Sequence, residues 1–249
     1  MPAPKKIPET DAIFERLSVV NPQADRAEDT LRLSLDAKAT VNVGPFSRKG
    51  RSRTGTRAAD HDFKPEATLT PFGIFSPEHD DLTLYMARSK VTSDFIVDRL
   101  RDWWEFNKIR FPEVTRLVLN LDNGPENHSR RTQFLKRIVA FAQEYGLRVQ
   151  LAHYPPYHSK YNPIERCWGV LEMHWNGSLL DSIEAVLGFA RTMTWEGKHP
   201  EVVLIETPYS KGVRVGPKEM EELESRVVRL PSLEKWFVEI PSGSAVDSG

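Results

Sequence analysis

The chain alternates short aliphatic strands with longer helical segments, and this order limits the folds open to it. Leu31, Leu33 and Leu35 alternate with polar residues, which is the period-two pattern of a strand. Further strands are predicted for residues 39–43, 72–75, 82–86, 116–121 and 148–152. Helical spacing predicts helices over residues 91–106 and 129–145, a helix opening at Asn162, and a short one at 11–20. Residues 178–240 are expected to add more helix and an irregular end.

Three early strands that can pair antiparallel, followed by strands alternating with helices, indicate a mixed sheet with helices on its faces. The segment at 39–43 follows the first strand closely enough to form a hairpin with it. Gly146 is expected to end the second long helix. Asn162 and Pro163 are expected at the N-cap and the first position of the next helix. The fold class is therefore α/β.

Composition excludes several classes of protein. The single cysteine, Cys167, cannot form an internal disulfide or a zinc site built on several thiolates, which favours a reducing, intracellular setting. No apolar run approaches the roughly 18 residues of a membrane helix, and the start lacks the apolar part of a secretory signal. The seven histidines contain no HxxxH or HExxH pair, which argues against a zinc hydrolase. The net charge of −1 means that any contact with DNA must come from local patches.

One basic patch is visible in the stretch SRKGRSRTGTR, whose glycines and serines predict an exposed loop. It contains no acid, and its cations are Arg48, Lys49, Arg51, Arg53 and Arg57. We expect this loop to contact DNA phosphates, which would add salt-sensitive affinity without reading sequence. The alternative is a flexible, solvated loop.

Three acids lie at or after the ends of predicted strands, which is where α/β proteins commonly form ligand sites. Asp36 ends the first strand, Asp122 directly follows the strand at 116–121, and Glu165 lies in the first turn of a helix. If those two strands are neighbours, the aspartates emerge side by side and the helix can lay Glu165 across them. Clustered carboxylates suit hard divalent cations such as Mg²⁺ or Mn²⁺. Two such ions roughly 3.5–4 Å apart can activate the attacking oxygen and stabilise the leaving oxygen of a phosphodiester.

Each acid also has a structural explanation. Asp36 can be a turn residue, and Asp122 opens Asp-Asn-Gly, a good hairpin turn, although Pro125 and a helix follow. Glu165 stands three residues after Asn162, as in a capping box. These alternatives stay open at the level of sequence.

Other polar residues surround the three acids in the sequence. His158 and Lys160, on the loop before Glu165, can bind DNA phosphate oxygens or remain solvated. Asn123, Asn127 and Asn162 can support the acids by hydrogen bonds or only satisfy the loop backbone. The tryptophans are expected in the core or at an interface rather than as base-stacking surfaces: Trp103, Trp104, Trp168 and Trp175.

The segments around these acids resemble a known family. LVLNLDNGPENHSRRTQFLKRIVAFAQEYGL, HYPPYHSKYNPIERCWGVLEMHWNG and the upstream LRLSLDAKATVNVGPFSRKGRSR are similar to the catalytic core of bacterial insertion-sequence DDE transposases. Within these, the integrase-like branch related to the mariner-type transposases is the most similar. The resemblance runs from about Leu31 to about Ser210, and its most specific part is PPYHSKYNPIERCW.

The resemblance implies an RNase H-like, retroviral-integrase-like fold with a mixed five-stranded sheet and flanking helices. It implies that Asp36, Asp122 and Glu165 are the first, second and third metal-binding acids. They would hold two Mg²⁺ or Mn²⁺ ions for DNA cleavage and strand transfer during transposition. The implied partners are transposon-end and target DNA and further copies of the chain, in the cytoplasm and nucleoid of a bacterium.

The resemblance also divides the chain. Residues 1–30 are expected to form a linker or remnant, residues 31–210 the catalytic domain, and residues 211–249 a helical extension with a disordered tail. Such transposases carry an amino-terminal helix-turn-helix, whereas only about 30 residues precede the first acid here. A truncated copy, a split reading frame or a domain of a longer protein would each explain this. Two other functions stay open: a non-catalytic remnant that only binds DNA, and a cellular RNase H-like nuclease.

Overall fold

The structure is a computed structural model, and it describes residues 6–46 and 65–243. The basic stretch from Arg48 to Arg57 lies outside the described residues, so its expected contact with DNA remains a prediction. Most of the tail expected to be disordered, residues 244–249, also lies outside them.

The described residues alternate helices and strands through the whole chain. The helices are α1 (Thr10–Arg26), α2 (Ser93–Asn107), α3 (Thr132–Tyr145), α4 (Ile164–Trp175), α5 (Ile183–Thr192) and α6 (Pro217–Glu224), with short 3₁₀ turns η1 (Lys108–Arg110) and η2 (Ser159–Tyr161). The strands are β1 (Thr30–Ala37), β2 (Val41–Val43), β3 (Ala67–Ser76), β4 (Asp81–Ala87), β5 (Arg116–Leu121), β6 (Arg148–His153), β7 (Glu201–Ile205), β8 (Val228–Arg229) and β9 (Phe237–Ile240).

The strands form one mixed sheet in the order β7-β4-β3-β1-β5-β6-β9-β8, with β2 added beside β3. At its centre β1, β5 and β6 run parallel, and β3 lies antiparallel to both β1 and β4. The expected α/β class, a mixed sheet with flanking helices, is confirmed. The sheet is larger than the five strands expected, because β7, β8 and β9 extend it at both sides.

Two local predictions were wrong. The segment at 39–43 does not form a hairpin with the first strand, since β2 pairs antiparallel with β3. The expected irregular end contributes strands, since β9 pairs with β6 and β8 pairs with β9. Both errors have one cause: these strands are three, four and two residues long, and their partners are distant in sequence. The prediction that Gly146 ends the second long helix is confirmed. Gly146 follows α3 and adopts the left-handed conformation, with φ 63°.

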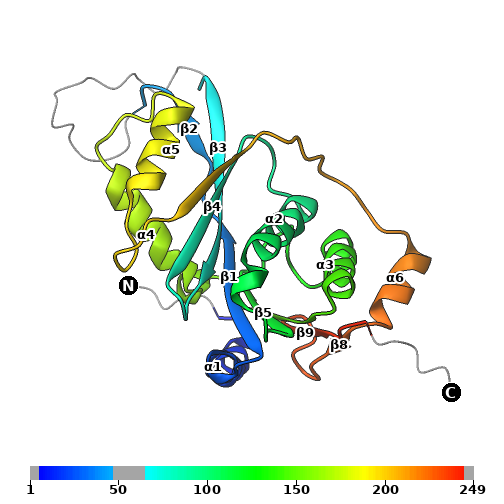
Figure 1. Ribbon diagram of the computed structural model, residues 1–249. Helices are drawn as coiled ribbons and strands as arrows, with labels where there is room; N and C mark the ends of the chain where they lie inside the picture. Colours follow the sequence, from blue (N-terminus) through cyan, green and yellow to red (C-terminus); the bar gives the residue numbers. More distant parts are fainter. Residues whose placement is uncertain (1–5, 47–64, 244–249) are drawn as a thin grey trace.

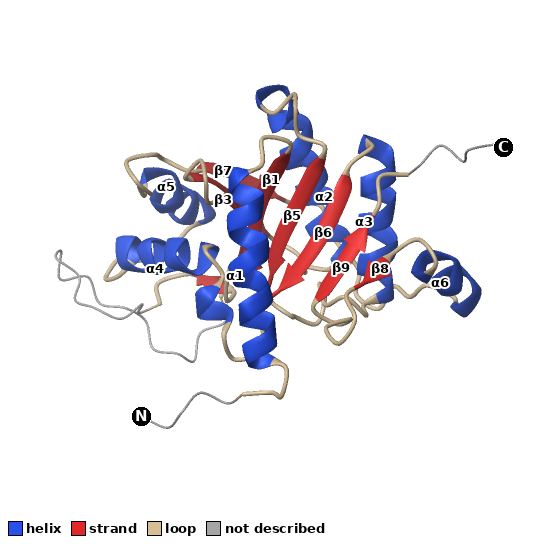
Figure 2. Ribbon diagram, turned by 90° about the horizontal axis from the view of Figure 1, so that it is seen from below, coloured by secondary structure: helices blue, strands red, loops and turns tan. Residues whose placement is uncertain are grey.

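Helices cover both faces of the sheet (Figures 1 and 2). On one face, α2 and α3 bury a large core against the alternate leucines of β1 and β5. On the other face, α4 and α5 pack against β2, β3 and β4. Among the described residues, no helix is long and apolar enough to cross a membrane.

Helix α1 lies across the sheet on the same face as α4 (Figure 2). It is longer than the helix expected at 11–20, and its buried residues Ile13, Leu17 and Val20 pack with Val118 of β5. Arg32 of β1 fixes it further, with two hydrogen bonds of 2.6 and 2.7 Å to the Asp25 carboxylate. Residues 10–26, expected in a linker, therefore pack on the core, whereas the proposed domain boundaries at 30 and 210 remain predictions.

Candidate active site

The parallel register of β1 and β5 brings two acids together at one edge of the sheet. Leu35 pairs with Leu121, so the next residues along the chain are Asp36, still within β1, and Asp122, which directly follows β5. Leu31, Leu33 and Leu35 face the α2–α3 core. Because side chains alternate along a strand, Asp36 points to the face that α4 covers.

The surroundings of Asp36 disfavour its charged form. Its side chain is 8% exposed. Burial above all, together with the negative charges of Asp122 and Glu165, raises the pKa of the Asp36 carboxyl to about 8. A hydrogen bond of 2.9 Å from the Trp168 indole to Asp36 Oδ2 acts in the opposite direction. Asp122 and Glu165 therefore each lie close enough to Asp36 for their charges to act on it.

Polar contacts with β1 fix the start of α4. The Ile164 amide donates to Ser34 Oγ at 3.0 Å, and Ser34 Oγ donates to Asn162 Oδ1 at 2.6 Å. The Asn162 amide also donates to the Leu35 carbonyl at 3.3 Å. The expected N-cap at Asn162 is therefore wrong. The Asn162 side chain is bonded to β1, and Ser34 of β1 supplies the acceptor for the first amide of the helix.

The capping-box explanation of Glu165 also fails. The box needs the backbone N–H of Asn162 to donate to the Glu165 carboxylate, but this N–H donates to the Ser159 carbonyl at 2.7 Å. Within the described part of the chain, no hydrogen bond or ion pair holds the Glu165 carboxylate. Glu165 lies in the first turn of α4 and is half-buried, so its carboxylate is available to a ligand.

A glycine on β3 allows α4 to approach the sheet this closely. Gly73 pairs with Asp36 across β1 and β3. A Cβ atom at position 73 would lie 2.6 Å from Ile164 Cδ1 and 2.9 Å from Trp168 Cη2. The missing side chain therefore lets the helix bring Trp168 onto Asp36.

The loop after β5 holds Asp122 from its other side. Asn127 Nδ2 donates to Asp122 Oδ1 at 2.7 Å. The Asn127 carbonyl in turn lies 2.9 Å from Nε2 of His153, a fully buried ring at the end of β6. Burial lowers the pKa of His153, and the carbonyls of Trp236 and Asn127, one at each ring nitrogen, act in the opposite direction.

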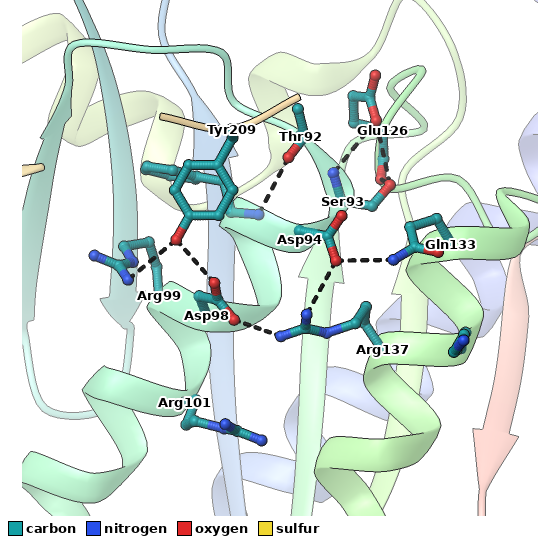
Figure 3. Close-up of polar contacts among 12 residues, drawn as sticks. Thr92, Ser93, Asp94, Asp98, Arg99, Arg101, Glu126, Gln133, Arg137 and Tyr209 are labelled. Atoms are coloured by element: carbon teal, nitrogen blue, oxygen red, sulfur yellow. Dashed lines mark hydrogen bonds and ion pairs between the residues drawn. The ribbon is translucent and has the colours of Figure 1, made fainter. Parts of the chain in front are cut away.

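A polar network beside the site anchors the same loop to α2 (Figure 3). The Ser93 hydroxyl donates to the Glu126 carbonyl at 2.7 Å and lies 3.2 Å from its carboxylate. Asp94 accepts from Gln133 at 2.8 Å and from Arg137 at 3.0 Å, which joins α2 to α3. The loop that holds Asp122 is thus anchored to α2, which is bonded in turn to α3.

Asp36 and Asp122 line one open pocket of about 210 Å³, with Phe72, Gly124 and Asn127 among its walls. Asn127 Oδ1 is buried and has no hydrogen-bond partner in the described residues. No group of three or more histidine, cysteine, aspartate or glutamate side chains is arranged to hold a metal ion in the described ranges. The two aspartates nevertheless suit a divalent cation, because Mg²⁺ commonly takes one or two carboxylates and completes its shell with water and phosphate oxygens.

The other predicted site residues lie around this edge with different exposures. His158 is buried, with its ring against Phe14 of α1 and stacked on Tyr161, and its Nδ1 lies 2.8 Å from the Pro156 carbonyl. Lys160 is exposed, and its ammonium lies 5.1 Å from the Tyr161 ring centre. Of these two, only Lys160 is open to solvent. Asn123 follows Asp122 and is half-buried.

The family of the chain follows from comparison with family models. The model described as Rhodopirellula transposase DDE domain matches residues 2–242. The chain belongs to this family. The match covers almost the whole sequence, including α1 and the strands β8 and β9. No curated protein matches the chain.

Solved structures similar to this DDE domain include complexes of the mariner transposase Mos1. The Mos1 paired-end complex with Mg has 13% sequence identity and a TM-score of 0.49, over 75% of this chain and 54% of that one. The Mos1 paired-end complex with the left transposon end has 12% identity and a TM-score of 0.47, over 75% and 56%. The DDE domain thus spans about half the length of these structures.

Sequence reasoning missed four residues that shape the site of the DDE domain. Trp168 is three residues after Glu165, which puts both on one helix face, so its spacing was an available signal. The other three, Ser34, Gly73 and His153, act through contacts with segments distant in sequence. No local pattern marks them.

Proposed function

We propose that this DDE domain is a DNA polynucleotidyl transferase that cleaves strands at transposon ends and joins them to target DNA. The observation that carries the proposal is the placement of Asp36 and Asp122 side by side at one pocket, with Glu165 near enough to act on Asp36. Membership of a transposase DDE family supports DNA as the substrate.

In this proposal Asp36, Asp122 and Glu165 hold two Mg²⁺ or Mn²⁺ ions. When bound, such ions activate the attacking oxygen and stabilise the leaving oxygen of a phosphodiester. Asp122 is the best prepared ligand, because the Asn127 amide fixes one of its oxygens at 2.7 Å. Trp168 orients Asp36 in the same way through its 2.9 Å hydrogen bond. Lys160 binds a non-bridging phosphate oxygen of the DNA as a point charge.

DNA outside the pocket would contact the basic stretch from Arg48 to Arg57. Contacts of this kind release counterions, so affinity is expected to fall steeply as salt rises. Joining two ends requires two sites, and we therefore propose that copies of the chain assemble on DNA. Sizing the protein by light scattering with and without a DNA end tests this, and a monomer under both conditions would contradict it.

The activity is tested with purified protein and supercoiled plasmid in Mg²⁺ or Mn²⁺. We expect metal-dependent nicking that Asp122→Asn abolishes. Residues that only orient a ligand cost about 10–100-fold when changed, so loss of a ligand should exceed this range. The control is Asp181→Asn, an exposed acid between α4 and α5, which should nick like the parent.

Circular dichroism of both variants checks that they are folded. Nicking by Asp122→Asn at the parental rate would overturn the assignment of the site. DNA binding without metal-dependent nicking by the parent would favour the non-catalytic remnant instead.

A further inference from the structure

A second pocket lies at the edge of the sheet opposite the acids. It has a volume of about 480 Å³ and is walled by α1 and by the first residues of β1, β5 and β6, which are Thr30, Arg116 and Arg148. The acids stand at the other ends of these strands. Because β5 and β6 have six residues each, the two sites are separated by roughly 17–20 Å. A small ligand in this pocket does not reach the candidate active site.

Positive charge gathers in this pocket from three elements. Arg116 and Arg148 are direct partners on neighbouring strands, a pairing of like charges that is unfavourable by itself. Arg16 of α1 is a third member of the lining. The Glu239 carboxylate lies 3.8 Å from the Arg116 guanidinium and 3.6 Å from the Arg148 guanidinium. Asp29 is the acid that lines the pocket. Arg116 also donates to the Gln150 amide oxygen at 3.0 Å, so the lining holds three guanidinium groups and one carboxylate, with Glu239 beside it.

Two of these arginines also have unused hydrogen-bonding capacity. The Nε atoms of Arg16 and Arg116 are buried and have no partner in the described part of the chain. A buried donor without an acceptor is costly, and such groups call for an explanation. An anionic oxygen acceptor would remove this cost and offset the excess charge.

The walls of the pocket limit the size and kind of anion. Val20 and Ala24 of α1 and Val118 of β5 supply an apolar side, and Gln23 and Gln150 supply amides. The volume lies within the range of small-molecule sites, which is about 300–1,000 Å³. Arginine forks match phosphate oxygens in pairs. A terminal phosphate carrying a sugar and base fits both the charged and the apolar parts.

We propose that this arginine pocket binds a phosphomonoester of nucleotide size. Two sources share this chemistry: a free mononucleotide, and the 5′-phosphorylated end of a DNA strand. The inference is independent of the proposed catalytic function, because it rests on another edge of the sheet and needs no metal ion.

The test measures binding to the full chain with EDTA present. The probes are deoxyadenosine monophosphate, followed by calorimetry, and a short dye-labelled single strand with either a 5′-phosphate or a 5′-hydroxyl, followed by fluorescence anisotropy. The variants are Arg116→Gln and Arg148→Gln. Arg148 has a side chain that is 55% exposed, so its replacement should fold normally. The matched control is Arg110→Gln, which removes an exposed arginine that pairs with Asp81 elsewhere.

We expect binding that depends on the phosphate and is weakened about tenfold or more by either pocket variant. The control should bind like the parent. Binding of the mononucleotide identifies a free nucleotide as the source, and binding of the phosphorylated strand alone identifies a DNA end. Equal binding of the phosphate and hydroxyl strands with no binding of the mononucleotide, or phosphate-dependent binding that both pocket variants retain, would overturn the proposal.

Discussion

At the scale of single residues, the site is organised around a carboxyl group that resists ionisation. Asp36 is buried beside two other acids, and its pKa rises to about 8. Unfolded, the same carboxyl titrates near its ordinary value of 3.8. Between about pH 4 and pH 8 the native protein therefore holds a proton that the unfolded chain has released. In this range the free energy of unfolding depends on pH through the Asp36 carboxyl.

The sign of this effect gives the first prediction. Without metal, stability contributed by Asp36 is fully present below about pH 4 and is lost as pH rises towards about 8. The slope for one proton is at most about 1.4 kcal/mol per pH unit. Urea unfolding in EDTA across this range should show the loss, and Asp36→Asn should flatten it. An equal slope in parent and variant would contradict the pKa assignment.

The second prediction concerns the hydrogen bond from Trp168 to Asp36. Trp168→Phe keeps an aromatic ring in the core but removes the indole donor, so the carboxylate loses the one side-chain partner that it has among the described residues. Affinity for Mn²⁺ should fall by about 10–100-fold, the range for residues that orient metal ligands. Calorimetric titration with Mn²⁺ measures this. Trp103→Phe, in the other core, is the control and should keep the parental affinity.

At the scale of elements, the approach of α4 to β3 decides where Glu165 stands. Gly73→Ala would put a methyl group against Ile164 and Trp168, at 2.6 and 2.9 Å before any movement. Overpacking of this kind costs about 1–3 kcal/mol, and we expect DNA nicking to fall with it because α4 carries Glu165. Gly169 lies on α4, and a Cβ atom added there would meet nothing within 4 Å. Gly169→Ala should therefore raise the free energy of unfolding by about 0.5–1 kcal/mol. Chemical denaturation of both variants measures the contrast.

Elements whose pattern is local were predictable, and elements that depend on distant partners were not. The alternating leucines of β1 and the helical spacing of α2 and α3 are read directly from neighbouring residues, and both predictions were confirmed. The pairing of β2 with β3 and of β9 with β6 depends on contacts made only in the folded sheet. The same limit applied at the site: Asp122 was placed by its strand, whereas Ser34 as the acceptor for α4 was not foreseen.

At the scale of the whole molecule, α1 is part of the core of the sheet. Leu17 is 3% exposed and packs with residues of β5 and of the chain before β9. Leu17→Ala should therefore cost about 2–5 kcal/mol. Val19→Ala, 40% exposed on the same helix, should stay within about 0.5 kcal/mol. Thermal and urea unfolding compare the two, and a small, equal effect of both would show that α1 contributes little to stability.

The central claim is that Asp36, Asp122 and Glu165 share divalent cations at one edge of the sheet. Anomalous diffraction from crystals soaked in Mn²⁺ tests it most directly, because it locates the metal without reference to activity. We predict a Mn²⁺ peak between the carboxylates of Asp36 and Asp122, lost in Asp122→Asn crystals. Mn²⁺ bound only elsewhere, in crystals where this edge is open to solvent, would contradict the account.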